Sequence, residues 1–272
     1  MNRNARLFCL LAALVLTGGW GGIDMQIAPQ LNAGGRPAPN PIPARLHLPS
    51  GSGPFPALVV LHTCGGLSRL GMGGPSLVEQ WVSRVNGWGY AALVPDSFAP
   101  RGVSTVCSPE AQPKVTAWDR AGDAVSAALA LRGRPEIDAG RIAVIGFSHG
   151  GATAAWVALK PAATAFPGLI RAAVDYYGSC GPAERYGGLP LLVLAGEADD
   201  WGNPAVSCRQ FAERLGAGAP VEVVTYPGVA HSFDNRNLVR RAFSFGHRVE
   251  YDHAAAEDSF ARVKAFLART LN

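Results

Sequence analysis

Residues 141–151 read RIAVIGFSHGG and hold the pattern that decides the fold. The first six residues are mostly apolar and β-branched, as in a strand that is buried on both faces of a sheet. Gly146, Ser148 and Gly150 then form Gly-x-Ser-x-Gly, and the residues that follow favour a helix. A glycine-flanked serine between a buried strand and a helix is typical of a nucleophile elbow, a sharp turn that lifts the hydroxyl above the sheet. The segment therefore predicts a reactive serine.

Strand-like and helix-like segments alternate on both sides of this turn. Strands are predicted at 44–48 (an edge strand), 55–62, 89–95, 141–146, 171–177, 189–195 and 221–226. Helices are predicted at 76–86, 117–131, 150–159, 204–215 and 254–271. This alternation predicts an α/β fold with a mostly parallel central sheet and helices on both of its faces.

The composition of the chain limits its class. Of the 272 residues, 48% are hydrophobic and only 16% are charged, which excludes a disordered chain. The net charge is +4, and Lys and Arg form no run of five or more, so a nucleic-acid-binding surface is not expected. No linker divides residues 42–272, which are predicted to form one domain after an extended lead-in at 23–41.

A signal peptide is predicted at residues 1–22. Arg3 and Arg6 precede the apolar run LFCLLAALVL at 7–16, and small residues follow it. This order is typical of a secretory signal, and the run is shorter than the roughly twenty residues of a membrane-spanning helix. Export to the periplasm or the medium is expected, with an uncleaved anchor or a misassigned start as the alternative. The cleavage site stays open.

Four cysteines lie beyond the predicted signal: Cys64, Cys107, Cys180 and Cys208. Export would allow disulfides among them, in any of three pairings, and buried free thiols are the alternative. No Cys-x-x-Cys pair, His-Glu-x-x-His motif, P-loop or dinucleotide fingerprint is present. Neither a metal nor a cofactor is therefore expected.

The predicted acid of the site follows a strand. A serine hydroxyl becomes a good nucleophile when a base takes its proton and an acid orients that base. Directly after the strand 189–195 the chain reads Gly-Glu-Ala-Asp-Asp, and Asp199 is the predicted acid. Asp200 and Glu197, in the same loop, are the alternatives.

The predicted base is His231, which closely follows the strand 221–226. It comes after Asp199 in the chain, and the order serine, acid, histidine is that of α/β-hydrolase folds. His247 and His253 also lie C-terminal to Asp199, but neither directly follows a predicted strand. No role is expected for them.

Two backbone N–H groups are predicted to stabilise the negative charge that develops on the carbonyl oxygen. One belongs to His149, which follows the nucleophile, and the other to Cys64, in the loop 62–66 after the first buried strand. Cys64 would act through its backbone, so its thiol need not react.

Five motifs together resemble those of the dienelactone hydrolase family of α/β-hydrolases. They are HTCGG (62–66), PDSF–PRG (95–102), GFSHGG (146–151), GEADD (196–200) and AHSF (230–233). The resemblance covers about residues 40–270 and implies an α/β-hydrolase fold. It also implies Ser148 as nucleophile, Asp199 as acid and His231 as base, with Cys64 in the oxyanion loop.

Two features depart from the pattern of this family. Founding members carry a cysteine nucleophile, and Ser148 in its place favours a general carboxylic-ester hydrolase. They also bind the substrate carboxylate through two arginines, and Arg101 and Arg236 lie near those positions. Both are candidate substrate-binding residues, with solvated loop charges as the alternative. Trp201 is a candidate for the lining of the pocket.

The expected function is therefore a serine hydrolase that cleaves carboxylic esters or lactones through an acyl-enzyme. Its partner would be a small-molecule substrate, without stable membrane insertion, and the enzyme would be a monomer or homodimer. A secreted serine peptidase, an acyltransferase and a silent binding protein are the alternatives.

Residues 234–252 are rich in Arg and Phe and form either a lid or specificity loop or a surface excursion. The natural substrate and acyl chain length stay open.

Overall fold

The computed structural model describes residues 22–67, 75–108, 110 and 114–271. Its central sheet has eight strands in the order β1-β2-β4-β3-β5-β6-β7-β8. They are β1 (Ile23–Ile27), β2 (Ile42–His47), β3 (Phe55–Leu61), β4 (Ala91–Pro95), β5 (Ile137–Phe147), β6 (Ala173–Tyr176), β7 (Leu191–Gly196) and β8 (Val221–Tyr226). β2 alone runs in the direction opposite to the other seven strands of this sheet. The mostly parallel sheet confirms the predicted α/β class.

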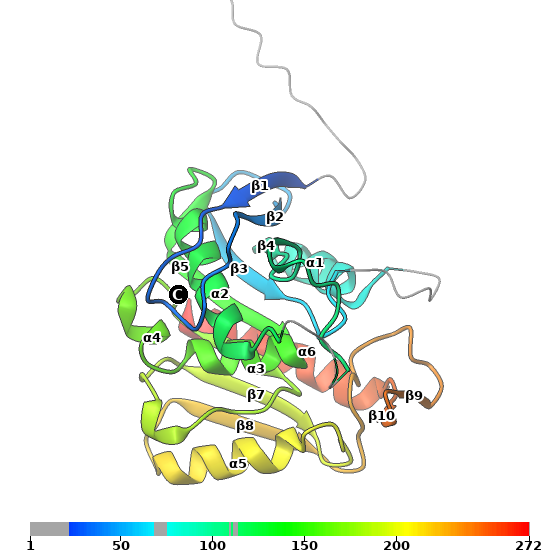
Figure 1. Cartoon of the computed structure of the whole chain (residues 1–272). Helices are drawn as coiled ribbons and strands as arrows, with labels where there is room; N and C mark the ends of the chain where they lie inside the picture. The colour runs from blue at the N-terminus through cyan, green and yellow to red at the C-terminus, as the bar shows by residue number, and fades with distance from the viewer. Residues whose placement is uncertain (1–21, 68–74, 109, 111–113, 272) are drawn as a thin grey trace, which may run out of the picture.

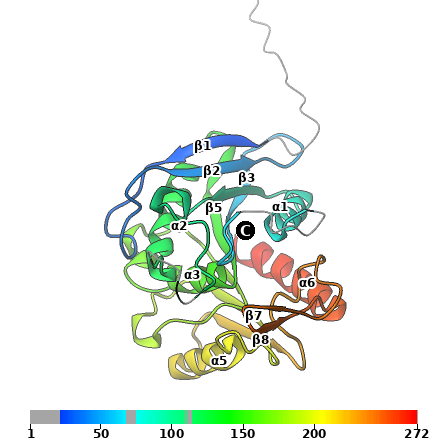
Figure 2. The same cartoon turned by 45° about the vertical axis from the view of Figure 1, so that its right-hand side comes forward.

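Helices cover both faces of this sheet (Figures 1 and 2). They are α1 (Leu77–Gly87), α2 (Ala117–Arg132), α3 (His149–Val157), α4 (Ala162–Ala165), α5 (Pro204–Leu215) and α6 (His253–Thr270). Helices α2, α3 and α5 pack on one face, and α1 and α6 pack on the other. The sheet therefore separates two hydrophobic cores.

The strand residues explain why both faces are buried. In β3, Ala57, Val59 and Leu61 point into the core beneath α2 and α3. Leu58 and Val60, which alternate with them, point into the core beneath α1 and α6. A continuous apolar strand of this kind can bury its side chains only between two layers of helix.

Local signals fix where two of the helices begin. Ser76 caps α1 and exchanges hydrogen bonds with Glu79, which forms a capping box. Thr116 and Asp119 form the same arrangement at the start of α2. Both boxes satisfy backbone N–H groups that have no partner inside the helix.

The N-terminal edge of the sheet differs from the prediction. Residues 23–41 were expected to form an extended lead-in, and 44–48 the edge strand. Instead β1 pairs with β2 along its whole length and is itself the edge. The pairing partner of IDMQI lies about twenty residues further along the chain, so local pattern alone does not reveal this strand. The predicted signal at 1–22 lies outside the described residues except for Gly22.

In the described part of the chain, every helix is too short or too polar to span a bilayer.

Asp175 on β6 is a fully buried acid, and its protonation is expected to make stability depend on pH. Its Oδ1 accepts a hydrogen bond from the N–H of Gly178 at 2.7 Å, and its Oδ2 has no partner among the described residues. Burial raises the pKa of Asp175 to about 7. Between pH of about 4 and 7 the folded protein thus holds a proton that the unfolded chain has lost, so stability falls as pH rises through that interval.

Asp175→Asn introduces an amide side chain of nearly the same shape as the neutral acid. It is expected to remove the fall in stability with rising pH. Relative to the wild type, the variant should gain unfolding free energy on the order of 4 kcal/mol between pH 4 and pH 8. Denaturant unfolding of both proteins across that range measures the difference. Parallel stability curves would show that Asp175 titrates at its usual pKa.

Candidate active site

Ser148 occupies the turn between β5 and α3 in a strained backbone conformation. Its φ is 55°, a value that residues with a side chain rarely adopt. A Cβ on Gly146 would lie 1.9 Å from the carbonyl oxygen of Gly150, and one on Gly150 would lie 2.3 Å from that of Leu61. Strand, turn and helix therefore approach too closely for any side chain at the two glycines. This packing fixes the position of the serine.

The structure brings the three predicted triad residues together. The Nε2 atom of His231 lies 3.0 Å from Oγ of Ser148, and its Nδ1 atom lies 2.7 Å from Oδ2 of Asp199. The side chains come from the ends of β8, β5 and β7 and meet at one edge of the sheet. His231 and Asp199 are 2% and 3% exposed. Since an ionised carboxylate can only accept, Nδ1–H donates to Asp199, and Nε2 is free to accept the proton of Ser148.

The alternative acids point elsewhere. Asp200 faces Nδ1 of His247 at 3.4 Å, and Glu197 forms an ion pair with Arg209 at 2.8 Å. Asp199 also accepts a hydrogen bond from the N–H of Trp201 at 2.9 Å, which fixes its carboxylate. Of the three candidates in this loop, only Asp199 contacts His231.

Ser148 opens into a pocket of about 190 Å³. The pocket includes the aliphatic or aromatic side chains of Leu67, Leu77, Val78, Trp201, Leu238, Phe245 and Val249. Apart from His231, its polar side chains carry hydroxyl or amide groups, such as those of Ser76 and Asn237. No Lys, Arg, Asp or Glu lines it among the residues that the structure describes. Trp201 lies in the pocket lining, as predicted, and its ring centroid lies 5.1 Å from that of His231.

The sequence profile of the dienelactone hydrolase family matches residues 42–271 of this chain. The chain belongs to the dienelactone hydrolase family. Membership makes it an enzyme of the carboxylic-ester hydrolase class, with the α/β-hydrolase fold. A relative from Methylorubrum extorquens, provisionally named a carboxymethylenebutenolidase, is 27% identical over 82% of this chain and 75% of its own.

Solved structures share the fold of this dienelactone hydrolase-family enzyme. A dienelactone hydrolase-like promiscuous phosphotriesterase from metagenomic libraries superposes with a TM-score of 0.68 at 21% identity, over 92% of this chain and 99% of its own. An esterase of Thermogutta terrifontis, solved with propionate bound, gives a TM-score of 0.63 at 20% identity, over 92% and 94% of the two chains.

The segment 234–252, predicted to be a lid or a surface excursion, forms one wall of the pocket. It contains a hairpin of β9 (Ala242–Ser244) and β10 (His247–Val249), with Phe245 at its turn. Val249 forms a β-bridge with His231, and the N–H of Glu250 donates to the carbonyl of His231 at 3.2 Å. The hairpin is thus attached to the loop that carries His231.

Two disulfides resolve the pairing that the sequence left open. Cys64 is bonded to Cys107, and Cys180 is bonded to Cys208, so the free-thiol alternative is wrong. Cys64 and Cys107 both border the pocket. Asp175 lies close to the second pair, but those sulfurs are bonded to each other and offer no thiolate for a metal.

A buried network missed by the sequence reasoning supports the loop of His231. Asp234 accepts hydrogen bonds from the hydroxyl of Tyr177 at 2.7 Å and from Nε1 of Trp81 at 2.6 Å. The Tyr177 ring lies 4.7 Å from that of His231, and burial raises the pKa of Asp234. The one signal in the sequence is an acid three residues after the predicted base.

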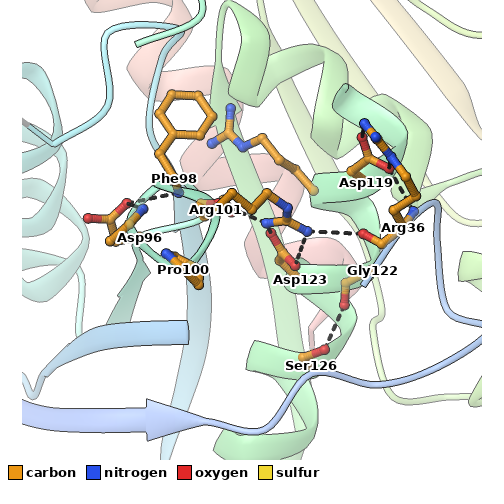
Figure 3. A network of polar contacts seen from close by, with 12 residues as sticks. Arg36, Asp96, Phe98, Pro100, Arg101, Asp119, Gly122, Asp123 and Ser126 are labelled. Atoms are coloured by element: carbon orange, nitrogen blue, oxygen red, sulfur yellow. Dashed lines mark hydrogen bonds and ion pairs between the residues drawn. The ribbon is translucent and has the colours of Figure 1, made fainter. Parts of the chain in front are cut away.

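The two arginines predicted to bind a substrate carboxylate lie elsewhere. The Arg101 side chain is 8% exposed and forms a bidentate ion pair with Asp123, at 2.6 and 3.1 Å (Figure 3). Arg236 is exposed and pairs with Glu257 on α6 at 3.2 Å. Neither lines the pocket. The expectation is corrected because position beside a motif does not fix the direction of a long side chain.

Arg101→Met is therefore expected to weaken the fold and not substrate binding. Loss of the guanidinium leaves Asp123 buried without its ion-pair partner, which should lower the unfolding free energy by about 3–5 kcal/mol. KM for a neutral ester should stay within about twofold of the wild type. Denaturant unfolding and steady-state kinetics measure the two effects. A rise in KM at unchanged stability would restore the substrate-binding role.

Proposed function

We propose that this enzyme hydrolyses neutral carboxylic esters by serine acyl transfer. Ser148 is the nucleophile, His231 the general base and Asp199 the acid that orients it. The observation that carries the proposal is the continuous hydrogen-bonded path from Oγ of Ser148 through both ring nitrogens of His231 to Asp199, at 3.0 and 2.7 Å.

The proposed reaction has two steps that share one set of groups. Oγ of Ser148 attacks the ester carbonyl carbon while its proton passes to Nε2 of His231, and Asp199 stabilises the imidazolium. The N–H groups of His149 and Cys64 bind the oxyanion. Collapse of the tetrahedral intermediate breaks the bond to the leaving oxygen, which takes the proton from His231. Water then attacks the acyl-enzyme by the same route, which releases the acid and restores the serine.

The lining of the pocket favours a neutral acyl group. A substrate carboxylate would enter a site whose described residues offer no cationic side chain, and an unpaired charge is costly to bury. Aliphatic side chains such as Leu77, Val78 and Leu238 suit a short to medium hydrocarbon chain. Two disulfides also support export, as expected from the predicted signal peptide.

Two esters of equal length test this proposal. p-Nitrophenyl butyrate and mono-p-nitrophenyl succinate differ in that a carboxylate replaces the terminal methyl group. We expect kcat/KM to be at least roughly tenfold higher for the butyrate, because the described lining of the pocket offers the charged end no cationic side chain. Faster cleavage of the succinate would contradict a neutral substrate. Cleavage of an aminoacyl p-nitroanilide without ester hydrolysis would indicate a peptidase, and preferred transfer to an added alcohol an acyltransferase.

A further inference from the structure

Arg120 is a fully buried cation close to the active site. It lies in the first turn of α2 and is 0% exposed. Its Nη1 atom lies 2.7 Å from Nδ1 of His149, and its Nη2 atom donates to the carbonyl oxygen of His62 at 2.7 Å. Burial and the Arg120 charge lower the pKa of His149 to about 3, so the imidazole is neutral and Nδ1 accepts.

These two contacts join the segments that carry the proposed oxyanion donors. His149 supplies one donor through its own N–H, directly after Ser148. His62 is the first residue of the loop 62–66, two residues before Cys64, which supplies the other. The contacts of Arg120 span 29 residues to His149 and 58 residues to His62. One rigid guanidinium therefore connects both halves of the oxyanion hole.

An ion pair does not account for this buried charge. Among the described residues, the guanidinium of Arg120 has a neutral ring nitrogen and a carbonyl oxygen as hydrogen-bond partners, and its Nε has none. The nearby carboxylate of Asp123 is bonded to Arg101 through both oxygens, as Figure 3 shows. Burial lowers the pKa of Arg120 to about 9, so it stays charged at neutral pH. A buried cation without a bonded carboxylate usually costs more than an apolar side chain.

The surroundings leave little freedom for these groups. The Phe98 ring lies 4.6 Å from the His62 ring, and the guanidinium carbon of Arg120 lies 5.1 Å from the centre of the Phe98 ring. A Cβ on Gly150 would lie 2.5 Å from the His62 carbonyl oxygen, so the loop rests directly on the elbow. Any shift of His62 is therefore transmitted to the backbone around the nucleophile.

We propose that Arg120 is a positioning residue that holds the N–H groups of His149 and Cys64 in register for the developing oxyanion. The proposal rests on the proposed serine mechanism. The planar fork of a guanidinium binds two acceptors at a fixed separation, which a single ammonium does not reproduce. Arg120 touches neither substrate nor Ser148, and its effect passes through His62 and His149.

Arg120→Met is expected to lower kcat for p-nitrophenyl butyrate by roughly 10²-fold, with KM within about threefold of the wild type. The inhibition constant of an aliphatic trifluoromethyl ketone, which forms a tetrahedral adduct with the serine, should rise by a similar factor. Arg120→Lys keeps the charge but not the fork, and its kcat should lie between those of Arg120→Met and the wild type. It also serves as the second test if the methionine variant does not fold.

Arg101→Met is the matched control, because it removes another buried arginine that contacts α2 but neither half of the oxyanion hole. It should lose stability and keep wild-type kcat. The proposal is overturned if both Arg120 variants keep kcat within about threefold of the wild type, or if Arg101→Met loses kcat equally. If the Ser148→Ala variant still hydrolyses the ester, the serine mechanism itself is overturned. The two failures are therefore distinguishable.

Discussion

Ser148→Ala is expected to lower kcat for p-nitrophenyl butyrate by roughly 10⁶-fold. The substitution removes the atom that bonds to the acyl carbon, and oxyanion donors alone leave only a small residual rate over water. Stability should change little, because the Ser148 side chain does not cap α3. Initial rates at high enzyme concentration, beside thermal unfolding, measure both quantities.

The matched control is Ser83→Ala, at an exposed position of α1 outside the pocket lining. It should keep kcat within about twofold of the wild type. If Ser148→Ala keeps more than roughly a hundredth of the wild-type rate while correctly folded, another group attacks the ester.

Asp199→Asn is expected to lower kcat by roughly 10⁴-fold. An amide in place of the carboxylate favours the wrong tautomer of His231 and does not stabilise its protonated form. Asp200→Asn offers a close comparison, since the neighbouring carboxylate faces His247 at 3.4 Å and not His231. That variant should remain close to the wild type in kcat. The reverse ranking of the two variants would move the acid to Asp200.

Where structure depends on neighbouring residues in the chain, the sequence predicts it well. The bounds of β8 and α5 agree with prediction, and the elbow at Ser148 follows from a buried strand, two glycines and a helix. His231 and Asp199 follow from their places after strands. Because parallel strands end at one edge of a sheet, such residues converge without further information.

Features that depend on distant partners could not be predicted in this way. β1 becomes a strand through pairing with β2, and the β9–β10 hairpin has strands of only three residues each. The direction of Arg101 depends on Asp123, 22 residues away, and not on the motif beside it. Arg120 lacks any sequence signal because its two partners meet only in the folded protein.

Modification by a fluorophosphonate tests the central claim most directly, because this reagent reacts with a serine that a neighbouring base activates. The labelled protein is digested, and the modified residue is identified by tandem mass spectrometry. We predict one adduct, on the peptide that carries Ser148, with loss of ester hydrolysis in proportion to labelling. An adduct on a different residue, or full inactivation with Ser148 unmodified, would contradict the assignment of the nucleophile.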